Sequence, residues 1–228
     1  MLSQKAARSD ESLVEHLISY LIQSYALTEE DLRAFRPSIC NRLDRNTSGI
    51  VAAGKSMAGL QSLSQMFHDR TIGKYYLCLT AGIIEKPSRV EGWLFKDERT
   101  NKVEILFQER PGSARIITEY RPIKSHDGVT LLEVHLITGK THQIRAHLAS
   151  IGHPILGDFK YGDPKLNEQI QKKYKVRSQL LHSWKLVMPE KLAQPLDYLS
   201  GKEFIAPLPA AFKKVLKGEG LETAESNS

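Results

Sequence analysis

Five strand-like runs follow one another between Gly73 and Ile137, with only short polar breaks between them. Each run is rich in β-branched or aromatic residues and stops at Gly, Pro, Asp or Asn, the usual pattern of strands joined by turns. The pair Asp127-Gly128 predicts a tight hairpin turn before the last run. Neighbouring strands with such short connections pair mainly in antiparallel fashion. The runs are 74–82, 89–95, 102–108, 115–124 and 129–138.

Helical patterns flank this block on both sides. Apolar residues recur at helical spacing over 13–22, where Ser9 and Asp10 are candidate caps, and over 57–67. Thr28 and Asp31 predict a capped helix that Pro37 ends. Further predicted elements are a strand over 49–55, helices over 141–152, 164–176 and 207–217, and a strand over 179–188.

Strands and helices in this order predict an α+β fold with a mixed, mostly antiparallel sheet. We expect one catalytic domain over 1–217. The last residues, 218–228, are acidic and polar, which predicts a disordered tail.

The composition limits the class of protein. Apolar residues make up 41% of the 228 residues and charged residues 25%, which is typical of a globular chain. No apolar run approaches the roughly 20 residues of a membrane span, and no apolar segment follows the basic N-terminus as in a secretory signal. Two cysteines, Cys40 and Cys78, do not make a disulfide framework. We therefore expect a cytoplasmic protein without a membrane partner, whose net charge of +6 suits a polyanionic partner.

The segment NRLDRNTSG, residues 41–49, is the first that could carry chemistry. It places Asp44 between Arg42 and Arg45 and continues into a tight turn that begins at Thr47. Nearby cations favour the ionised form of a carboxyl group, which suits a nucleophile or a base. The alternative is a structural aspartate that bonds loop amides or one of the two arginines.

A second polar segment, GKTHQIRAHL at residues 139–148, opens a predicted helix. Its first turn brings together Lys140, His142 and Gln143, followed by Arg145, and helix N-termini favour anions. The histidines of this region do not have the spacing of a metal pair on one helical face. No phosphate-binding loop or dinucleotide motif occurs. We therefore expect neither a metal nor a cofactor.

These segments resemble the motifs of the RluA-type pseudouridine synthases, which isomerise uridine in RNA. The family motif H-R-L-D-x-x-T-S-G matches here with Asn41 in place of His, and its catalytic aspartate corresponds to Asp44. Arg145 matches the arginine that pairs with that aspartate. The family's K-x-Y strand matches at Lys74 and Tyr76, which implies that Tyr76 stacks on the target base.

Further parts of the resemblance concern the uridine pocket. Leu181 matches the family's L-H-A strand, with Ser183 in place of Ala. The resemblance implies that residues around the catalytic aspartate bind the substrate, and Arg42 and Arg45 are assigned to the loop or to the RNA backbone. The predicted substrate-binding residues are Arg42, Arg45, Thr47, Lys74, His142, Gln143 and Leu181.

The resemblance implies a reaction that needs no cofactor. The N1–C1′ bond of a uridine breaks, the uracil turns, and its C5 joins C1′. Asp44 could attack C1′ or the ring, or deprotonate C2′, and the sequence is compatible with all three. The expected partner is RNA, with 23S ribosomal RNA preferred and transfer RNA as the alternative, and the expected state is a monomer.

Two rival functions remain open from the sequence. One is a non-catalytic RNA-binding module. The other is a glycoside or nucleoside hydrolase, which needs a second carboxylate, for which Asp158 and Asp163 are the candidates. Family members usually begin with an extra strand and an N-K-P-x-G loop, and many carry an S4 RNA-binding domain. Neither has a counterpart in this sequence, so we expect a shortened catalytic domain.

Overall fold

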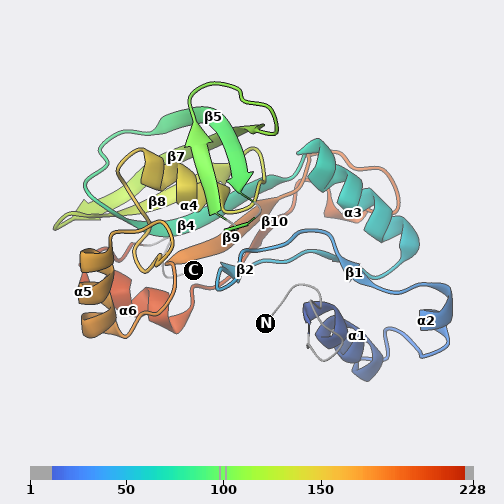
Figure 1. The fold of residues 1–228 in the computed structure, drawn as a ribbon. Coiled ribbons are helices and arrows are strands. Elements are labelled where there is room, and N and C mark those ends of the chain that lie inside the picture. Colours follow the sequence, from blue (N-terminus) through green and yellow to red (C-terminus); the bar gives the residue numbers. More distant parts are fainter. Residues whose placement is uncertain (1–11, 98, 101, 224–228) are drawn as a thin grey trace. The chain divides into compact units, whose positions relative to one another are not determined.

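The computed structural model describes residues 12–97, 99–100 and 102–223, which fall into two compact units. The first unit contains residues 12–45, 50–72 and 187–203. The second contains the remaining described residues, namely 46–49, those within 73–186, and 204–223. Figure 1 labels the elements along the chain.

The second unit is built on the sheet that the sequence predicts. The strand order is β10-β9-β4-β8-β7-β5-β6, with β2 paired to β9. The β4–β8, β7–β8, β5–β7 and β5–β6 pairs are antiparallel, and β2 runs parallel to β9. The strands are β2 (Ser48–Gly49), β4 (Gly73–Ala81), β5 (Ser88–Asp97), β6 (Lys102–Leu106), β7 (Ala114–His126), β8 (Val129–Leu136), β9 (Leu181–Val187) and β10 (Glu203–Ile205).

The predicted hairpin turn between β7 and β8 is confirmed. Asp127 and Gly128 both have positive φ, 46° and 76°. Two successive residues with positive φ give the twist that fits a two-residue hairpin, and Asp-Gly is a favoured pair there. The local sequence was therefore sufficient to fix this connection.

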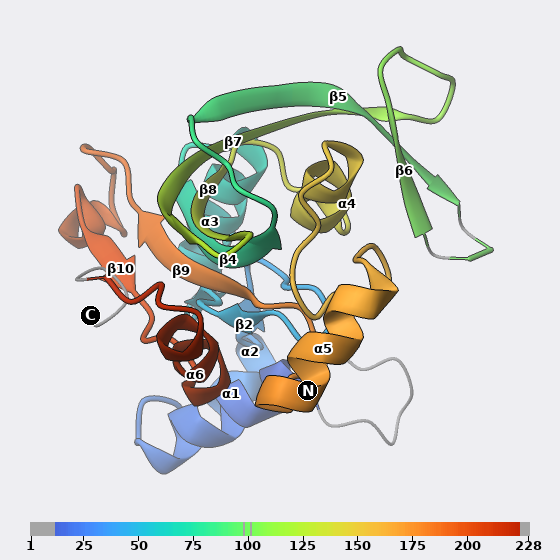
Figure 2. The same ribbon diagram turned by 90° about the vertical axis from the view of Figure 1, so that its left-hand side faces the viewer.

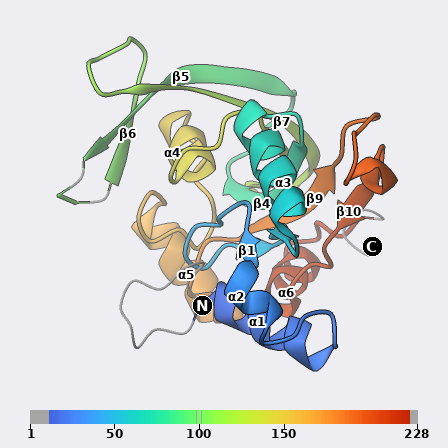
Figure 3. The ribbon, with the colours of Figure 1, turned by 90° about the vertical axis from the view of Figure 1, so that its right-hand side faces the viewer.

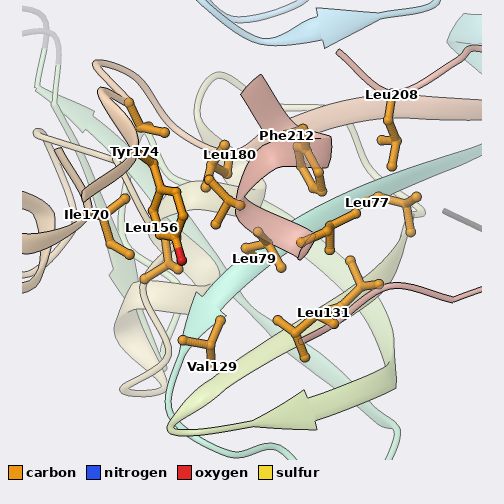
Figure 4. Close-up of a cluster of buried hydrophobic side chains, with 14 of the residues drawn as sticks. Leu77, Leu79, Val129, Leu131, Leu156, Ile170, Tyr174, Leu180, Leu208 and Phe212 are labelled. Carbon is orange, nitrogen blue, oxygen red and sulfur yellow. The ribbon is translucent and has the colours of Figure 1, made fainter. Parts of the chain in front are cut away.

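One face of the sheet carries the main core against α5 (Pro164–Tyr174) and α6 (Ala210–Gly218). Figure 4 shows Leu77, Leu79 and Leu131 of the sheet directed at the side chains of these helices. Trp184 of β9 belongs to the same cluster. The helices contribute Ile170, Tyr174, Phe212, Val215 and Leu216.

The opposite face is covered by α4 (Gln143–Ser150). Ala146 packs there with Leu94, Val103 and Ile116, three apolar residues of β5, β6 and β7. Figure 2 shows α4 within the curve of β5, β7 and β8. The sheet of the second unit is thus covered by helices on both faces.

The first unit contains short elements around a two-stranded sheet, in which β1 pairs antiparallel with β3. The predicted capping at the second helix is confirmed, because Thr28 N–H donates to the Asp31 carboxylate at 2.8 Å and Asp31 N–H donates to Thr28 Oγ1 at 3.2 Å. Figure 3 shows its helices. The elements are α1 (Leu13–Gln23), α2 (Asp31–Ala34), β1 (Ser38–Ile39), β3 (Ala53–Gly54), α3 (Met57–Asp69) and the 3₁₀ turn Asp197–Leu199.

The fold class is confirmed as α+β with a mixed, mostly antiparallel sheet, but three local predictions need comment. The prediction of one continuous strand over 49–55 is wrong. Only the short strands β2 and β3 form there, and they pair with different partners. Within the predicted tail, Leu221 is fully buried in the main core. Residues 224–228 lie outside the described residues, as do Ser9 and Asp10. Ser12 precedes α1, and its N–H donates to Glu15 at 3.0 Å.

Among the helices that the structure describes, none has the length and apolar character needed to cross a bilayer.

Candidate active site

The Asp44 loop begins in the first unit, where hydrogen bonds of the Asn41 side chain join its two ends. Asn41 Nδ2 donates to Ile50 O at 3.3 Å, and Ala52 N–H donates to Asn41 Oδ1 at 2.7 Å. One side chain therefore joins the chain entering the loop to the chain leaving it. These bonds also explain why 50–52 do not extend a strand. Asp44 is half-buried between the exposed Arg42 and Arg45.

Residues 46–49 of the loop belong to the second unit, where they are bound to β9 and to Gln179, two residues before it. Gln179 Nε2 donates to Thr47 Oγ1 at 3.1 Å, and Ser48 Oγ lies 2.8 Å from His182 Nδ1. Gly49 has a φ of 115°, and a Cβ there would lie 2.1 Å from Ser183 O. Only glycine fits this position, because both the backbone angle and the close approach exclude a side chain.

Tyr76 lies on the face of the sheet that α4 covers. It pairs with Val134, which in turn pairs with Tyr120, two residues from Thr118. Thr118 Oγ1 contacts Gln143 Nε2 at 3.0 Å and His147 Nδ1 at 2.8 Å, both on α4. Since side chains alternate along strands, Tyr76 shares this face. Tyr75 faces the other way and stacks on His135, as a packing residue should.

Two further predicted site residues share the α4 face. Lys74 lies two residues before Tyr76, and its Nζ is 3.7 Å from where a Cβ of Gly139 would stand. Trp184 points into the main core, so alternation along β9 directs Leu181 to the opposite side. The structure thus brings Lys74, Tyr76 and Leu181 to the same face as the helix that carries Arg145. The side chains of Lys74, Tyr76, Leu181 and Arg145 are all buried, with exposed fractions of 4–8%.

Arg145 is held by a buried carboxylate. Its Nε and Nη2 donate to the two carboxylate oxygens of Asp158 at 2.7 and 2.9 Å. Asp158 also accepts the N–H groups of Lys160 and Tyr161. Burial by itself would raise the pKa of the Asp158 carboxyl, but the hydrogen bonds and charge of Arg145 outweigh it, so this pKa lies below its usual value. This bidentate geometry fixes the plane of the guanidinium group.

The Gln143 side chain is hydrogen-bonded within the second unit, and its role in substrate binding stays a prediction. Its side-chain oxygen accepts from Thr138 Oγ1 and from Lys140 N–H, and its Nε2 donates to Ile117 O and Thr118 Oγ1. With 2% of its surface exposed, it is committed to joining α4 to β7. Its polarity suggested a ligand contact, whereas the requirement it meets is the pairing of buried backbone groups.

His142 precedes α4 in a left-handed conformation, with a φ of 53°. Its Nδ1 lies 2.8 Å from the Tyr161 hydroxyl, which also accepts the N–H of Val103 at 3.1 Å. The Tyr161 ring also lies 5.2 Å from the Arg145 guanidinium. Tyr161 orients both predicted site residues, His142 and Arg145.

A family model described as RNA pseudouridylate synthase matches residues 9–150. The chain belongs to this family. The match includes Asp44, Tyr76 and Arg145, and it supports the resemblance to the RluA type that the motifs indicated.

Curated relatives of the family are named for ribosomal RNA enzymes. Ribosomal large subunit pseudouridine synthase C of Buchnera aphidicola is 32% identical over 205 residues, which cover 82% of this chain and 60% of the relative. Synthase D of Borreliella burgdorferi is 30% identical over 204 residues, 89% of this chain and 58% of the relative. The chain thus spans little more than half the length of these relatives.

Solved structures support the fold. The chain named Human RNA Pseudouridylate Synthase Domain Containing 4 superposes with a TM-score of 0.67 at 24% identity, covering 84% of this chain and 78% of that one. The chain named Human RNA Pseudouridylate Synthase Domain Containing 1 superposes with a TM-score of 0.64 at 21% identity, covering 90% of this chain and 85% of that one. Both likenesses concern the pseudouridine synthase fold.

Sequence reasoning missed three residues that organise the site, namely Asp158, Tyr161 and His182. Asp158 and Tyr161 lie in GHPILGDFKYGD, residues 152–163, where Asp158 was considered only as the second carboxylate of a hydrolase. A signal for its structural role was present, because an aspartate that follows a glycine after an apolar run often serves a fixed turn. Nothing local to His182 pointed to its partner Ser48, 134 residues earlier.

Proposed function

We propose that this chain isomerises specific uridines of RNA to pseudouridine, with Asp44 as the catalytic carboxylate. The observation that carries the proposal is the family match over residues 9–150, which contains the Asp44 loop and the Arg145 helix. The resemblance of NRLDRNTSG to the family's catalytic motif supports the assignment to Asp44.

The reaction rearranges one nucleotide without an oxidant, reductant or imported group. The N1–C1′ bond breaks, a C5–C1′ bond forms, the C5 hydrogen leaves as a proton, and N1 gains a proton. A carboxylate serves this chemistry either as a nucleophile toward C1′ or the ring or as a base that removes a proton from C2′. We therefore propose a mechanism that uses the chain's own side chains and no cofactor.

The second unit would supply the surroundings of the uridine. Tyr76 is assigned to stacking on the base, since a flipped pyrimidine is held between flat aromatic or apolar groups. Leu181 and Lys74 line the same face. Arg145 is assigned to keeping Asp44 ionised and oriented. This role is supported by the Asp158 pair, which fixes two of the three guanidinium nitrogens at 2.7 and 2.9 Å.

The proposed partner is RNA, with large-subunit ribosomal RNA as the first candidate and transfer RNA as the second. The names of the relatives favour the ribosomal target. Arg42 and Arg45 are exposed next to Asp44 and are assigned to the RNA backbone. Because such contacts displace counterions, RNA binding should weaken steeply as salt rises. We propose that the protein acts as a monomer in the cytoplasm.

The hydrolase alternative is disfavoured by the positions of its two candidate carboxylates. Asp158 is 1% exposed and saturated by Arg145 and two backbone N–H groups. Asp163 caps α5 by accepting the N–H of Leu166 at 2.8 Å. Each of them already serves the structure, so neither is placed as the second catalytic group of a glycosidase.

Nucleoside analysis tests the proposal against both rivals. The protein is incubated with unmodified 23S ribosomal RNA transcript and, separately, with unmodified transfer RNA, and the nucleosides of each digest are separated by liquid chromatography before mass spectrometry, because uridine and pseudouridine have the same mass. We expect pseudouridine to form in at least one RNA. Free uracil would indicate a hydrolase, and RNA binding without any product would indicate a binding module. Either result would overturn the proposal.

A further inference from the structure

The segment directly after Asp44 is attached to β9 by backbone and side-chain contacts at successive residues. Ser48 pairs with His182 and Gly49 with Ser183 in a parallel register. The Ser48 hydroxyl contacts His182 at 2.8 Å. The same strand carries Leu181, which the proposed function assigns to the uridine pocket. The strand that lines the pocket thus also holds the end of the catalytic loop.

The contact between Ser48 and His182 has a defined direction. His182 Nε2 lies 3.3 Å from Ala206 O, and a carbonyl oxygen can only accept, so Nε2 carries the hydrogen. In the neutral ring Nδ1 is then the acceptor, and the Ser48 hydroxyl donates to it. Burial lowers the pKa of His182, although the bond to Ala206 works against this, so the ring is neutral at pH 7.

The His182 end of this hydrogen bond is buried, whereas Ser48 is half-buried. His182 is 2% exposed, and its two ring nitrogens are both bonded within the second unit. If the Ser48 hydroxyl were removed, Nδ1 would be left without its donor in a buried place, and the loop would lose its side-chain anchor four residues after Asp44. A displacement of about 1 Å in a reacting group can lower a rate by about a hundredfold.

We propose that Ser48 and His182 are positioning residues of the reaction, which fix the Asp44 loop through a hydrogen bond from the half-buried Ser48 hydroxyl to the buried His182 imidazole. This inference rests on the proposed function. It assigns neither residue a contact with the reacting atoms. Its consequence is a loss that falls on the chemical step, whereas RNA binding is left nearly intact.

The test measures single-turnover rates and RNA affinity for the wild-type protein, Ser48→Ala, His182→Asn and His182→Leu. We expect Ser48→Ala and His182→Leu to lower the rate at saturating protein by about 10- to 100-fold, with Kd for RNA changed less than threefold. His182→Asn keeps an acceptor near the place of Nδ1 and should recover a substantial part of the rate. The double variant Ser48→Ala with His182→Leu should lose no more than the worse single variant, because both remove one bond.

Ser56→Ala is the matched control. It also removes one hydroxyl hydrogen bond, the 3.2 Å cap that Gly59 N–H makes at the start of α3, so it should lower stability by a similar amount. Its rate should match the wild type. If a variant at Ser48 or His182 is unfolded by circular dichroism, His182→Asn and Ser48→Thr provide folded comparisons.

The outcomes separate the two proposals. A wild-type protein that forms no pseudouridine overturns the proposed function and this inference together. An active wild type with unchanged rates in Ser48→Ala and His182→Leu overturns the inference alone. A loss confined to RNA affinity, or an equal loss in Ser56→Ala, would also overturn it, because the bond would then act only in binding or in general stability.

Discussion

The buried pair between Arg145 and Asp158 is the strongest single contact around the candidate site. Both residues are nearly inaccessible, and the carboxylate is satisfied on both oxygens. Removing one partner from such a buried pair costs far more than the intact pair contributes over an apolar replacement. Asp158 therefore contributes to the stability of the buried Arg145 side chain.

We expect Asp158→Ala to lower the free energy of unfolding by about 3–5 kcal/mol. Asp163→Ala, five residues further along the chain, removes only the N-terminal cap of α5. It should lower the free energy of unfolding by about 1 kcal/mol. Urea unfolding at pH 7 measures both. Equal losses in the two variants would show that Arg145 does not depend on its carboxylate partner.

The buried His147 makes the free energy of unfolding depend on pH. Its Nε2 is buried without a hydrogen-bond partner among the described residues, and burial lowers the pKa of His147 to about 4. The unfolded chain, with a histidine pKa of about 6.5, binds this proton first as the pH falls. The folded state should therefore lose stability between pH 6.5 and 4, by about 2 kcal/mol at pH 5.

Urea unfolding at pH 7 and pH 5 tests this for the wild type and for His147→Gln. The variant has no titrating group at this position, so its loss between the two pH values should be smaller by about 2 kcal/mol. His182 has a pKa lowered in the same direction and remains in both proteins, so it does not affect the comparison. Identical pH dependence in the two proteins would contradict the role of His147.

At the scale of elements, β2 exists because Gly49 allows it. Two residues make a strand only through their pairing with β9, and the backbone of Ser183 occupies the place of a Gly49 side chain. Gly128 in the β7–β8 turn also has a positive φ, but nothing lies within 4 Å of its missing Cβ. Both glycines therefore need a positive φ, but only at Gly49 does another part of the backbone occupy the place of a side chain.

We expect Gly128→Ala to cost about 1–2 kcal/mol, the penalty for a left-handed alanine. Gly49→Ala should cost clearly more, because β2 must also move away from β9. Thermal and urea unfolding of the two variants compare them. A Gly49→Ala protein as stable as Gly128→Ala would mean that β2 does not rest against β9 at the observed distance.

Elements that local sequence determines were predictable, and elements that distant partners determine were not. The strands β4 to β8 and the Asp127-Gly128 turn follow from alternation and turn chemistry within each segment. The split of 49–55 could not be predicted, since it depends on Asn41 on one side and on β9 on the other. Leu221 looked like part of a polar tail because its burial depends on α6 and the sheet.

The candidate site divides in the same way. Asp44, Tyr76 and Arg145 could be named from motifs, because their neighbours in sequence carry the resemblance. The partner of Arg145 and the acceptor of the Ser48 hydroxyl could not, since each contact joins segments that only the folded chain brings together. The substrate-binding role of Gln143 stays a prediction, and its side chain also pairs with buried groups of the second unit.

For the whole molecule, we propose that this chain isomerises uridine in RNA with Asp44 as the catalytic group. The positive net charge of +6 and the exposed arginines beside Asp44 suit a polyanionic substrate. The second unit places Tyr76, Lys74, Leu181 and the Arg145 helix on one face of its sheet. These features support the proposed isomerisation of uridine only if Asp44 is required for it.

Tritium release from RNA labelled at uridine C5 tests that requirement most directly, because joining C5 to C1′ must expel the C5 hydrogen. The wild-type protein, Asp44→Ala and the surface control Asp163→Ala are compared on unmodified 23S ribosomal RNA, after circular dichroism has shown that all three are folded. We expect release by the wild type and the control, and release below detection for Asp44→Ala. Release by Asp44→Ala at the wild-type rate would contradict the account.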